Sequence, residues 1–382
     1  MVIYSLKKFK SASGFQKNYE EMENLIALIT PACASLIFIL MLTPLIRKFA
    51  IIIQLVDKPN ARKVHHQPTP LVGGISIFAA TTLALLLSDV FLKGIGTFVP
   101  LLTGSFVMLA MGAIDDKMNI KPIYRLGIQL ICAYSIAASG IRIHSFYGIF
   151  GVTEIPILSQ YFITILIIAG VVNAYNLMDG VDGLLASLAL VTFLLFTAIA
   201  YRLRAGELTA MYLAISCSIV GFLRFNFSKK NKIFLGDAGS LLLGFILVVS
   251  GIYLLNLSYQ VEKINNPQIL VLVVGVFIVP VLDSLRVYRS RIKRGTSPFK
   301  ADKTHLHHLF LFIGASHKKI TLVISTASVL IALVSASLCS ILSITWGIVL
   351  GSLLFAVFFM ILVINHSVME WRRKVEQLEN KV

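Results

Sequence analysis

The sequence predicts an all-α, polytopic integral membrane protein with ten or eleven transmembrane helices. Of its 382 residues, 57% are hydrophobic and only 14% are charged, which is too apolar a composition for a water-soluble globular domain. The apolar residues gather in stretches of about 20 residues, the length that a helix needs to cross the hydrocarbon of a bilayer. Eleven stretches are candidate spans: 25–46, 71–92, 98–114, 126–143, 157–172, 184–201, 208–223, 240–258, 268–285, 320–340 and 342–364.

The distribution of positive charge predicts the orientation of these spans. With eleven spans and a cytoplasmic C-terminus, 25 of the 34 Lys and Arg residues fall in cytoplasmic segments and 9 fall on the other side. This asymmetry is the positive-inside pattern of inner or plasma membrane proteins. It accounts for the net charge of +16 without a nucleic-acid partner. The lipid bilayer is the partner that this charge pattern predicts.

The two ends of the chain are more polar than the region between them. Residues 1–24 lack the apolar core of a signal peptide, and their lysines fit the charge asymmetry worst, so we interpret them as a polar leader with Met22 as an alternative start. Residues 25–364 form the transmembrane domain, and residues 365–382 form a cytoplasmic tail. The tail is either a short amphipathic helix at the membrane interface or a frayed end.

Five polar clusters separate the spans, and all of them lie on the predicted cytoplasmic side. The first is the stretch 57–63, Asp-Lys-Pro-Asn-Ala-Arg-Lys, which ends at Lys63. The second is the pair Asp115 and Asp116, at the end of the span 98–114. Adjacent carboxylates at a helix end can bind Mg²⁺ or share a proton so that one acts as a base, although such a pair also serves as a simple loop boundary.

The third cluster carries four polar side chains at three-residue spacing, Asn173, Asn176, Asp179 and Asp182. An ionised carboxylate at the centre of a bilayer costs about 2.5–3.5 kcal/mol, so acids beside such apolar runs need a role other than folding. Oxygen donors of this kind suit a hard cation that keeps water ligands and meets substrate phosphates. Capping of the following helix would explain one of the acids but not four polar groups.

The last two clusters contain one acid between glycines and a group of histidines. Asp237 stands between two glycines at the start of a span, where a helix N-terminus favours phosphate. His305, His307 and His308 follow a segment rich in Arg and Lys. Because no Cys or Glu completes a zinc site, phosphate contact is the favoured interpretation, and a proton relay or a surface role stays open.

In this order the clusters resemble the polyprenyl-phosphate N-acetylhexosamine-1-phosphate transferase superfamily, glycosyltransferase family 4, from Asp57 to about residue 364. The last motif is similar to that of the bacterial undecaprenyl-phosphate GlcNAc-1-phosphate transferases, whereas phospho-MurNAc-pentapeptide translocases carry a triple-His variant instead. The matching residues are Asp-Lys-Pro-Asn-x-Arg-Lys (57–63) with Pro70 and Gly73-Gly74, Asp115-Asp116, Asn-x-x-Asn-Leu-x-Asp-Gly-x-Asp-Gly (173–183), Phe-x-Gly-Asp-Ala-Gly-Ser (234–240) and His-x-His-His (305–308).

The resemblance implies a reaction on the cytoplasmic face. A UDP-N-acetylaminosugar, most simply UDP-GlcNAc, gives its sugar 1-phosphate to undecaprenyl phosphate and releases UMP, as the first membrane step of a cell-envelope polysaccharide such as lipopolysaccharide or teichoic acid. One phosphate must attack another, so a metal and cations have to relieve their repulsion. The implied cofactor is Mg²⁺, with Mn²⁺ as a substitute. The sequence leaves the oligomeric state, monomer or homodimer, open.

The resemblance also implies roles for individual residues. Asp237 and Asn176 are expected to hold Mg²⁺ against the diphosphate, and Asp115, supported by Asp116, to position or deprotonate the lipid phosphate. The remaining expectations are uracil stacking by Phe234, nucleoside contact by Asn226 and Asp182, phosphate or sugar contact by Arg125, His305, His307 and His308, and no assigned role for Asn173, Asp179 and Lys63.

Two departures from the family pattern leave open the geometry of phosphate binding, for Arg125, and the identity of the sugar, for Leu71. Arg125 stands where the family usually has Lys, and Leu71 stands where the GlcNAc branch commonly has Arg. A 6-deoxy sugar and phospho-MurNAc-pentapeptide are therefore alternatives.

Two other classes of membrane protein are disfavoured. In the CDP-alcohol phosphotransferases an Ala-Arg pair follows the motif that Asp179-Gly-Val-Asp182 resembles, and this chain has no Ala-Arg at that place. A transporter would place its acids near the membrane midplane rather than at span ends.

Overall fold

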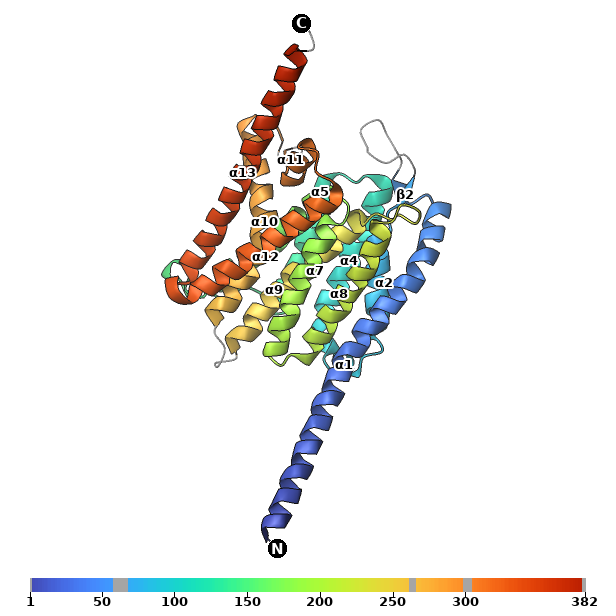
Figure 1. Ribbon diagram of the computed structural model, residues 1–382, viewed down its shortest axis with the longest axis vertical. Coiled ribbons are helices and arrows are strands. Elements are labelled where there is room, and N and C mark those ends of the chain that lie inside the picture. The colour runs from blue at the N-terminus through green and yellow to red at the C-terminus, as the bar shows by residue number, and fades with distance from the viewer. Residues whose placement is uncertain (1, 58–67, 261–265, 298–303, 380–382) are drawn as a thin grey trace.

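Helices make up almost all regular structure in the computed structural model, which describes residues 2–57, 68–260, 266–297 and 304–379. The predicted all-α class is confirmed, with a single pair of two-residue strands as the exception among the described residues (Figure 1). The helices are α1 (Val2–Ile52), α2 (Gly73–Leu85), α3 (Asp89–Lys93), α4 (Ile95–Met118), α5 (Pro122–Ala138), η1 (Ile149–Gly151), α6 (Ile157–Met178), α7 (Leu184–Arg202), α8 (Gly206–Asn226), α9 (Gly236–Gln260), α10 (Asn266–Lys293), α11 (Leu306–Phe312), α12 (His317–Leu342) and α13 (Ile344–Glu379).

Nine of the helices in the described ranges are long and apolar enough to cross a membrane. They are α1 from Leu25 onward, α4, α6, α7, α8, α9, α10, α12 and α13, and each corresponds to a predicted span. The other two predicted spans are shorter helices. The stretch 126–143 overlaps the 17 residues of α5, and the stretch 71–92 divides into α2 and α3. The division occurs at Ser88, whose side chain accepts a hydrogen bond from Phe91 N and thereby starts a new helix.

The ends of the chain continue the first and last spans as helix. α1 and α13 are the longest helices, and they project from opposite ends of the bundle (Figure 1). The predicted leader therefore has no helix boundary at residue 24, and the predicted tail has none at residue 364. Large apolar side chains such as Met41, Leu45 and Met360 are exposed on the outward faces of α1 and α13, as expected for surfaces that face lipid.

The centre of the bundle is α9, in whose most apolar 18-residue segment 94% of the residues are buried. Five helices, α2, α4, α6, α7 and α10, pack against α9 and cover its apolar surface, so α9 is the core of the bundle and not a lipid-facing span. Two glycines permit the closest approaches near its N-terminus. A Cβ atom on Gly112 would lie 2.4 Å from the Ala238 backbone, and one on Gly74 would lie 2.3 Å from Gly239. The beginning of α9 is thus fixed by direct backbone contact.

Two short strands lie at the same end of the bundle. β1 (Val56–Asp57) pairs with β2 (Thr69–Pro70) in antiparallel register, and Asp57 faces Thr69. The segment that leads into α9 joins them, since Phe234 N donates to Pro70 O at 2.8 Å. This pairing brings Asp57 and Phe234 to the N-terminus of the central helix. Lys63, between the strands, lies outside the described residues.

Candidate active site

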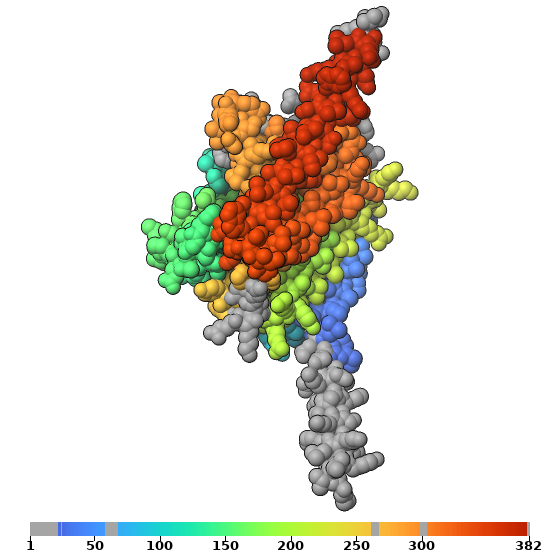
Figure 2. Space-filling model, turned by 60° about the vertical axis from the view of Figure 1, so that its left-hand side comes forward, coloured from blue at the N-terminus to red at the C-terminus, as the bar shows by residue number. Residues whose placement is uncertain are grey.

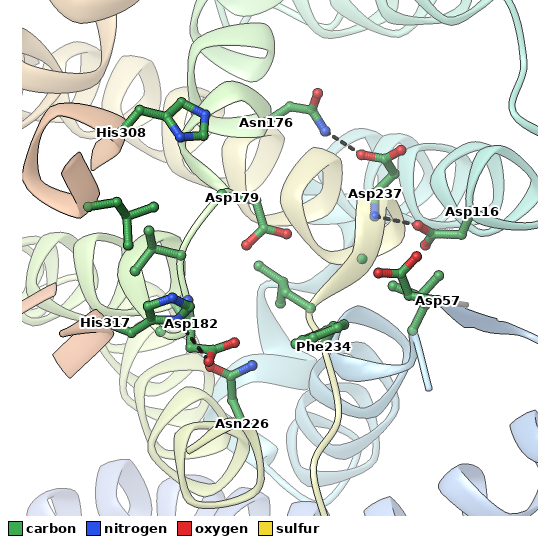
Figure 3. Close-up of a pocket in the computed structure, with 18 of the residues that line it drawn as sticks. Asp57, Asp116, Asn176, Asp179, Asp182, Asn226, Phe234, Asp237, His308 and His317 are labelled. Carbon is green, nitrogen blue, oxygen red and sulfur yellow. Dashed lines mark hydrogen bonds and ion pairs between the residues drawn. The ribbon is translucent and has the colours of Figure 1, made fainter. Parts of the chain in front are cut away.

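A cavity of about 790 Å³ opens at the N-terminal end of α9. Its walls come from segments far apart in the sequence, and Figure 3 shows their polar side chains directed toward a common space. Most of the residues singled out from the sequence line it, namely Asp57, Asp115, Asp116, Asn176, Asp179, Asp182, Asn226, Phe234, Asp237 and His308. The expectation that the polar clusters meet at one end of the bundle is therefore met for these residues.

Asp237 is presented to the cavity by the first turn of α9. Asn176, in the last turn of α6, donates from Nδ2 to Oδ1 of Asp237 at 2.7 Å. The same Nδ2 atom lies 2.7 Å from Oγ of Ser240, one turn further along α9. The amide therefore turns its nitrogen toward Asp237 and its oxygen away, as Figure 3 shows. For Asn176 to offer its oxygen to a cation beside Asp237, the amide has to turn over.

Asp116 caps the start of α9 from the neighbouring helix α4. Its Oδ1 accepts from Asp237 N at 2.8 Å, and its Oδ2 accepts from Ala238 N at 3.1 Å. A carboxylate at this position satisfies backbone donors that a helix N-terminus leaves unpaired. Gly236 makes the approach possible, because its φ is +75° and a Cβ there would lie 2.5 Å from Asp116 Oδ2. Asp116 thus fixes where Asp237 stands.

Asp115 is bound on both oxygens. Its Oδ1 accepts from Ile120 N at 2.7 Å, and its Oδ2 accepts from Nη1 of Arg125 at 2.8 Å. The same Nη1 atom lies 3.9 Å from Oδ2 of Asp237. Arg125 therefore stands between two carboxylates, and the buried Asp115 holds it there. This arrangement suits a positioning role for Asp115 better than a role as a base.

Asp179 lies between Asp237 of α9 and Asp182 on the far side of the cavity (Figure 3). Burial raises the pKa of this carboxyl well above its ordinary value, and the negative charges of Asp237, Asp116 and Asp182 raise it further. A carboxyl group in such a field is stabilised by a cation. The sequence pattern left Asp179 without a role, and its surroundings now point to one beside a metal ion.

The donors present fit a divalent cation that shares its ligands with substrate. Asp237 and Asp179 supply carboxylate oxygens, and Asn176 supplies an amide oxygen once it turns over. Within the described ranges, no three His, Cys, Asp or Glu side chains come close enough to form a complete metal site. Mg²⁺ is commonly held by one or two carboxylates, with water and substrate phosphates completing the octahedron. An incomplete protein shell of oxygen donors is therefore the kind of site that Mg²⁺ uses.

Asp182 forms a charged cluster with Lys232 and His317 on the wall of the cavity that lies across from Asp237. Its Oδ2 accepts from Lys232 Nζ at 2.7 Å and lies 2.9 Å from Nδ1 of His317. Burial alone would raise the pKa of Asp182, but the hydrogen bonds from His317 and Lys232 outweigh burial and lower it. Lys232 Nζ also lies 5.1 Å from the centroid of the Phe234 ring. A cation thus links the acid to the aromatic ring expected to stack on uracil.

Asn226 shapes this wall rather than presenting its amide freely. The side chain is buried, and Nδ2 donates to Ile233 O at 2.9 Å. That bond closes the loop from the end of α8 to Phe234. The Oδ1 atom is buried without a hydrogen-bond partner among the described residues. It remains the polar atom that Asn226 can offer to a nucleoside.

The three histidines take different positions. His308 lines the cavity, whereas His305 is buried outside the lining with Nδ1 at 2.9 Å from Oδ2 of Asp283. His307 packs so closely on the glycine turn after α6 that a Cβ on Gly180 would lie 2.3 Å from its Nε2. Burial, with smaller contributions from His308 and His305, lowers the pKa of His307 to about 3. The group expected to contact substrate is therefore divided into one lining residue and two supporting residues.

Asn173 also lies outside the cavity lining. Its Nδ2 donates to Oε1 of Gln129 at 2.7 Å and to Ala169 O at 2.8 Å. It therefore connects α6 with α5 inside the bundle. This contact accounts for one of the four regularly spaced polar residues by helix packing.

Three residues that line the cavity or contact its lining residues belong to none of the sequence motifs. Lys232 lies in the loop after α8, His317 is the first residue of α12, and His366 lies inside α13. Basic residues near the predicted ends of spans usually reflect membrane orientation, so the sequence does not mark these three as site residues. For Lys232, its position two residues before Phe234 is the sequence feature that could have indicated a place in the site.

Comparisons with known proteins identify the family of the chain. Residues 98–255 match the family described as Glycosyl transferase family 4. The undecaprenyl-phosphate alpha-N-acetylglucosaminyl 1-phosphate transferase of Yersinia pestis is 31% identical over 81% of this chain and 84% of its own length. The proteins of the same name from Salmonella typhi and Escherichia coli K12 are 31% and 30% identical, over 75% and 81% of this chain and 77% and 83% of their own lengths. The chain therefore belongs to glycosyl transferase family 4, a family of polytopic membrane enzymes, and is a sugar-1-phosphate transferase.

Proposed function

We propose that the protein transfers N-acetylglucosamine 1-phosphate from UDP-GlcNAc to undecaprenyl phosphate and releases UMP. The main support for the proposal is that one cavity has two walls of different chemical character. Asp237 and Asp179 form an acidic, cation-binding wall, and Phe234 and Asp182 form a wall suited to a nucleoside. A volume of about 790 Å³ lies within the range of roughly 300–1,000 Å³ that small-molecule sites occupy.

The nucleotide end of the donor is assigned to the Phe234 wall. The ring of Phe234 offers a face for uracil, and Asp182 accepts hydrogen bonds from a base N–H or from ribose hydroxyls. Lys232, held by Asp182, adds a positive charge on the side of the α-phosphate. The diphosphate then extends toward Asp237 at the N-terminus of α9, where the helix dipole favours negative charge.

The reaction is a displacement at phosphorus. An oxygen of the lipid phosphate forms a bond to the phosphorus that carries the sugar. The bond from that phosphorus to the bridging oxygen breaks, and UMP leaves with the bridging oxygen and its electron pair. Mg²⁺, when held by Asp237, Asp179 and Asn176, would neutralise charge on the diphosphate as it reacts.

Arg125 and Asp115 are assigned to the acceptor. The guanidinium of Arg125 offers a planar pair of donors for the lipid phosphate, and the bond to Asp115 at 2.8 Å sets its direction. A phosphate monoester is largely ionised at neutral pH, with a second pKa of about 6. No protein base is needed to create the nucleophile, which agrees with the full use of both Asp115 oxygens.

The choice of sugar and the side of the membrane rest on separate support. The relatives from Yersinia pestis and Escherichia coli carry names that specify GlcNAc, at 31% and 30% identity. The cytoplasmic placement of the cavity and of the C-terminus rests on the excess of Lys and Arg on that side. A cytoplasmic cavity also faces the compartment that supplies UDP-sugars.

A donor panel tests the proposal. Purified protein in lipid is given undecaprenyl phosphate, Mg²⁺ and one UDP-sugar at a time, including UDP-GlcNAc and a 6-deoxy-N-acetylhexosamine donor. Lipid products are identified by mass, and UMP is quantified. We expect a lipid diphosphate carrying GlcNAc and one UMP for each lipid product. Entry of labelled sugar nucleotide into sealed vesicles without any lipid-linked product would favour a transporter instead.

A further inference from the structure

The C-terminal helix forms part of the cavity wall. α13 runs for 36 residues and lies obliquely across the outside of the bundle, as Figure 2 shows in red. Beyond the last predicted span residue it continues to His366, which lines the cavity together with His308 and Phe312 of α11. The segment expected to be a tail therefore reaches the candidate active site.

Three side chains on one face of α13 attach it to the rest of the protein. Phe359, His366 and Arg373 are spaced by seven residues, which places them on the same side of a helix two turns apart. Arg286 of α10 stacks on the Phe359 ring, with Cζ at 4.2 Å from the centroid. This face of α13 is thereby fixed to α10 and α11, and α13 packs against both helices.

Phe312 of α11 is the residue that α13 holds most directly. The His366 ring lies 4.1 Å from the Phe312 ring between centroids, and the guanidinium Cζ of Arg373 lies 4.3 Å from the same centroid. Arg373 Nη2 also donates to Phe312 O at 2.8 Å. Within the part of the chain that the structure describes, the His366 ring forms no hydrogen bond. Its ring nitrogens are therefore available to a ligand in the cavity.

The position of this wall indicates which part of the donor meets it. The uracil side is taken by Phe234 and Asp182, the diphosphate by Asp237, and the lipid phosphate by Arg125. Figure 3 places His308, which α11 carries beside this wall, away from Asp116 and Asp57. The moiety still without a wall is the sugar. An imidazole can hydrogen-bond hydroxyl or acetamido groups of a neutral sugar without adding a fixed charge.

We infer that His366 of α13 binds the sugar moiety of the nucleotide-sugar donor, and that Arg373 is a positioning residue that holds His366 against Phe312. The inference rests on the proposed function, because it takes a UDP-sugar as the donor. α13 is in this view a specificity element of the active site and not only a membrane anchor.

Binding of two ligands that differ by the sugar tests this directly. The dissociation constants of UDP-GlcNAc and of UMP are measured by calorimetry on the full-length protein with Mg²⁺ and without lipid acceptor. His366→Ala should weaken UDP-GlcNAc binding by about 3- to 10-fold, the effect of one lost hydrogen bond to a neutral group, and leave UMP binding within about twofold. Arg373→Ala should show the same selective loss, and Arg373→Lys, which can still reach Phe312 O, a smaller one.

Lys374→Ala is the matched control, because Lys374 pairs with Glu370 on the exposed surface of the same helix at 2.9 Å. It should bind both ligands as the unaltered protein does. Equal weakening of UMP and UDP-GlcNAc in His366→Ala, or no weakening of either, would overturn the inference. Failure of the proposed function is distinct, because it appears as donor binding by the unaltered protein without any lipid-linked product in the panel assay.

Discussion

Asn176 and Asp237 meet in the cavity, with Nδ2 of Asn176 at 2.7 Å from Oδ1 of Asp237, although 61 residues separate them in the chain. The contact forms because α6 ends and α9 begins at the same end of the bundle, and the two helices pack together. An amide and a carboxylate at two helix ends make a partial site for a hard cation, which substrate phosphates complete.

Arg125 bridges Asp115 and Asp237, so its shape as well as its charge should affect acceptor binding. Arg125→Ala leaves the buried Asp115 without its ion-pair partner and should lower kcat/KM for undecaprenyl phosphate by about 100-fold or more, since hydrogen bonds to charged groups contribute roughly 1.5–3 kcal/mol each. Arg125→Lys should recover part of that loss. Steady-state kinetics with varied lipid acceptor measure both effects. Lys117→Ala is the control, because Lys117 is an exposed cation two residues after Asp115 at the end of α4. Equal activity of Arg125→Ala and Lys117→Ala would contradict the assignment.

Lys232 links Asp182 to Phe234, and on that basis we propose that it contacts the nucleotide. Lys232→Met removes the charge but keeps the length of the side chain. The KM for the UDP-sugar should rise about tenfold, while the KM for undecaprenyl phosphate should stay unchanged. Lys230→Met in the same loop is the control, because Lys230 is exposed and does not line the cavity. A rise confined to the lipid KM would show that Lys232 serves the acceptor instead.

Gly180 allows His307 to pack against the turn after α6. A Cβ at this position would lie 2.3 Å from His307 Nε2, so Gly180→Ala must displace the histidine or the turn. We expect a loss of about 1–3 kcal/mol in stability and reduced turnover. Gly170→Ala is the control, since apart from its chain neighbours and the backbone of its own helix no atom lies within 4 Å of the added Cβ, and alanine favours the helix. Thermal unfolding in detergent should separate the two variants, and equal melting temperatures would contradict the packing argument.

His307 should make the protein sensitive to mild acid. Its pKa is lowered from 6.5 to about 3 in the folded protein, mainly by burial. Below pH 6.5 the unfolded chain binds a proton that the folded protein does not, so stability falls as pH decreases between about 6.5 and 3. At pH 5.5 the loss from this one group is on the order of 1 kcal/mol relative to pH 7.5. His307→Gln should lack this component, and a parallel pH dependence of unfolding in both proteins would exclude it.

The sequence predicted the bundle and the common side of the polar clusters because both follow from simple physics. Apolar stretches of spanning length define the helices, and the charge asymmetry places Asp115, Asn176 and Asp237 at one end. The division of the stretch 71–92 was missed, because the capping effect of Ser88 depends on local geometry that hydropathy does not record.

The partners of individual atoms could not be predicted in the same way. Asp116 was expected to support catalysis from its place beside Asp115, yet both of its oxygens cap α9. His305 shares a motif with His308, but a helix begins between them, and His305 pairs with Asp283 instead. His366 belongs to no motif, and only the packing of α13 on α11 brings it to the cavity.

The role of Asp237 in binding Mg²⁺ is tested most directly by its effect on Mg²⁺-dependent product formation. Unaltered protein, Asp237→Asn and Asp237→Ala are compared for UMP release and lipid-linked sugar from UDP-GlcNAc and undecaprenyl phosphate over a range of Mg²⁺ concentrations. Asp237→Asn keeps the shape of the side chain and should separate loss of charge from loss of folding. Both variants should lose activity by at least about 10²- to 10³-fold, and excess Mg²⁺ should not restore it. Lipid product formed by Asp237→Ala at the rate of the unaltered protein would contradict this role.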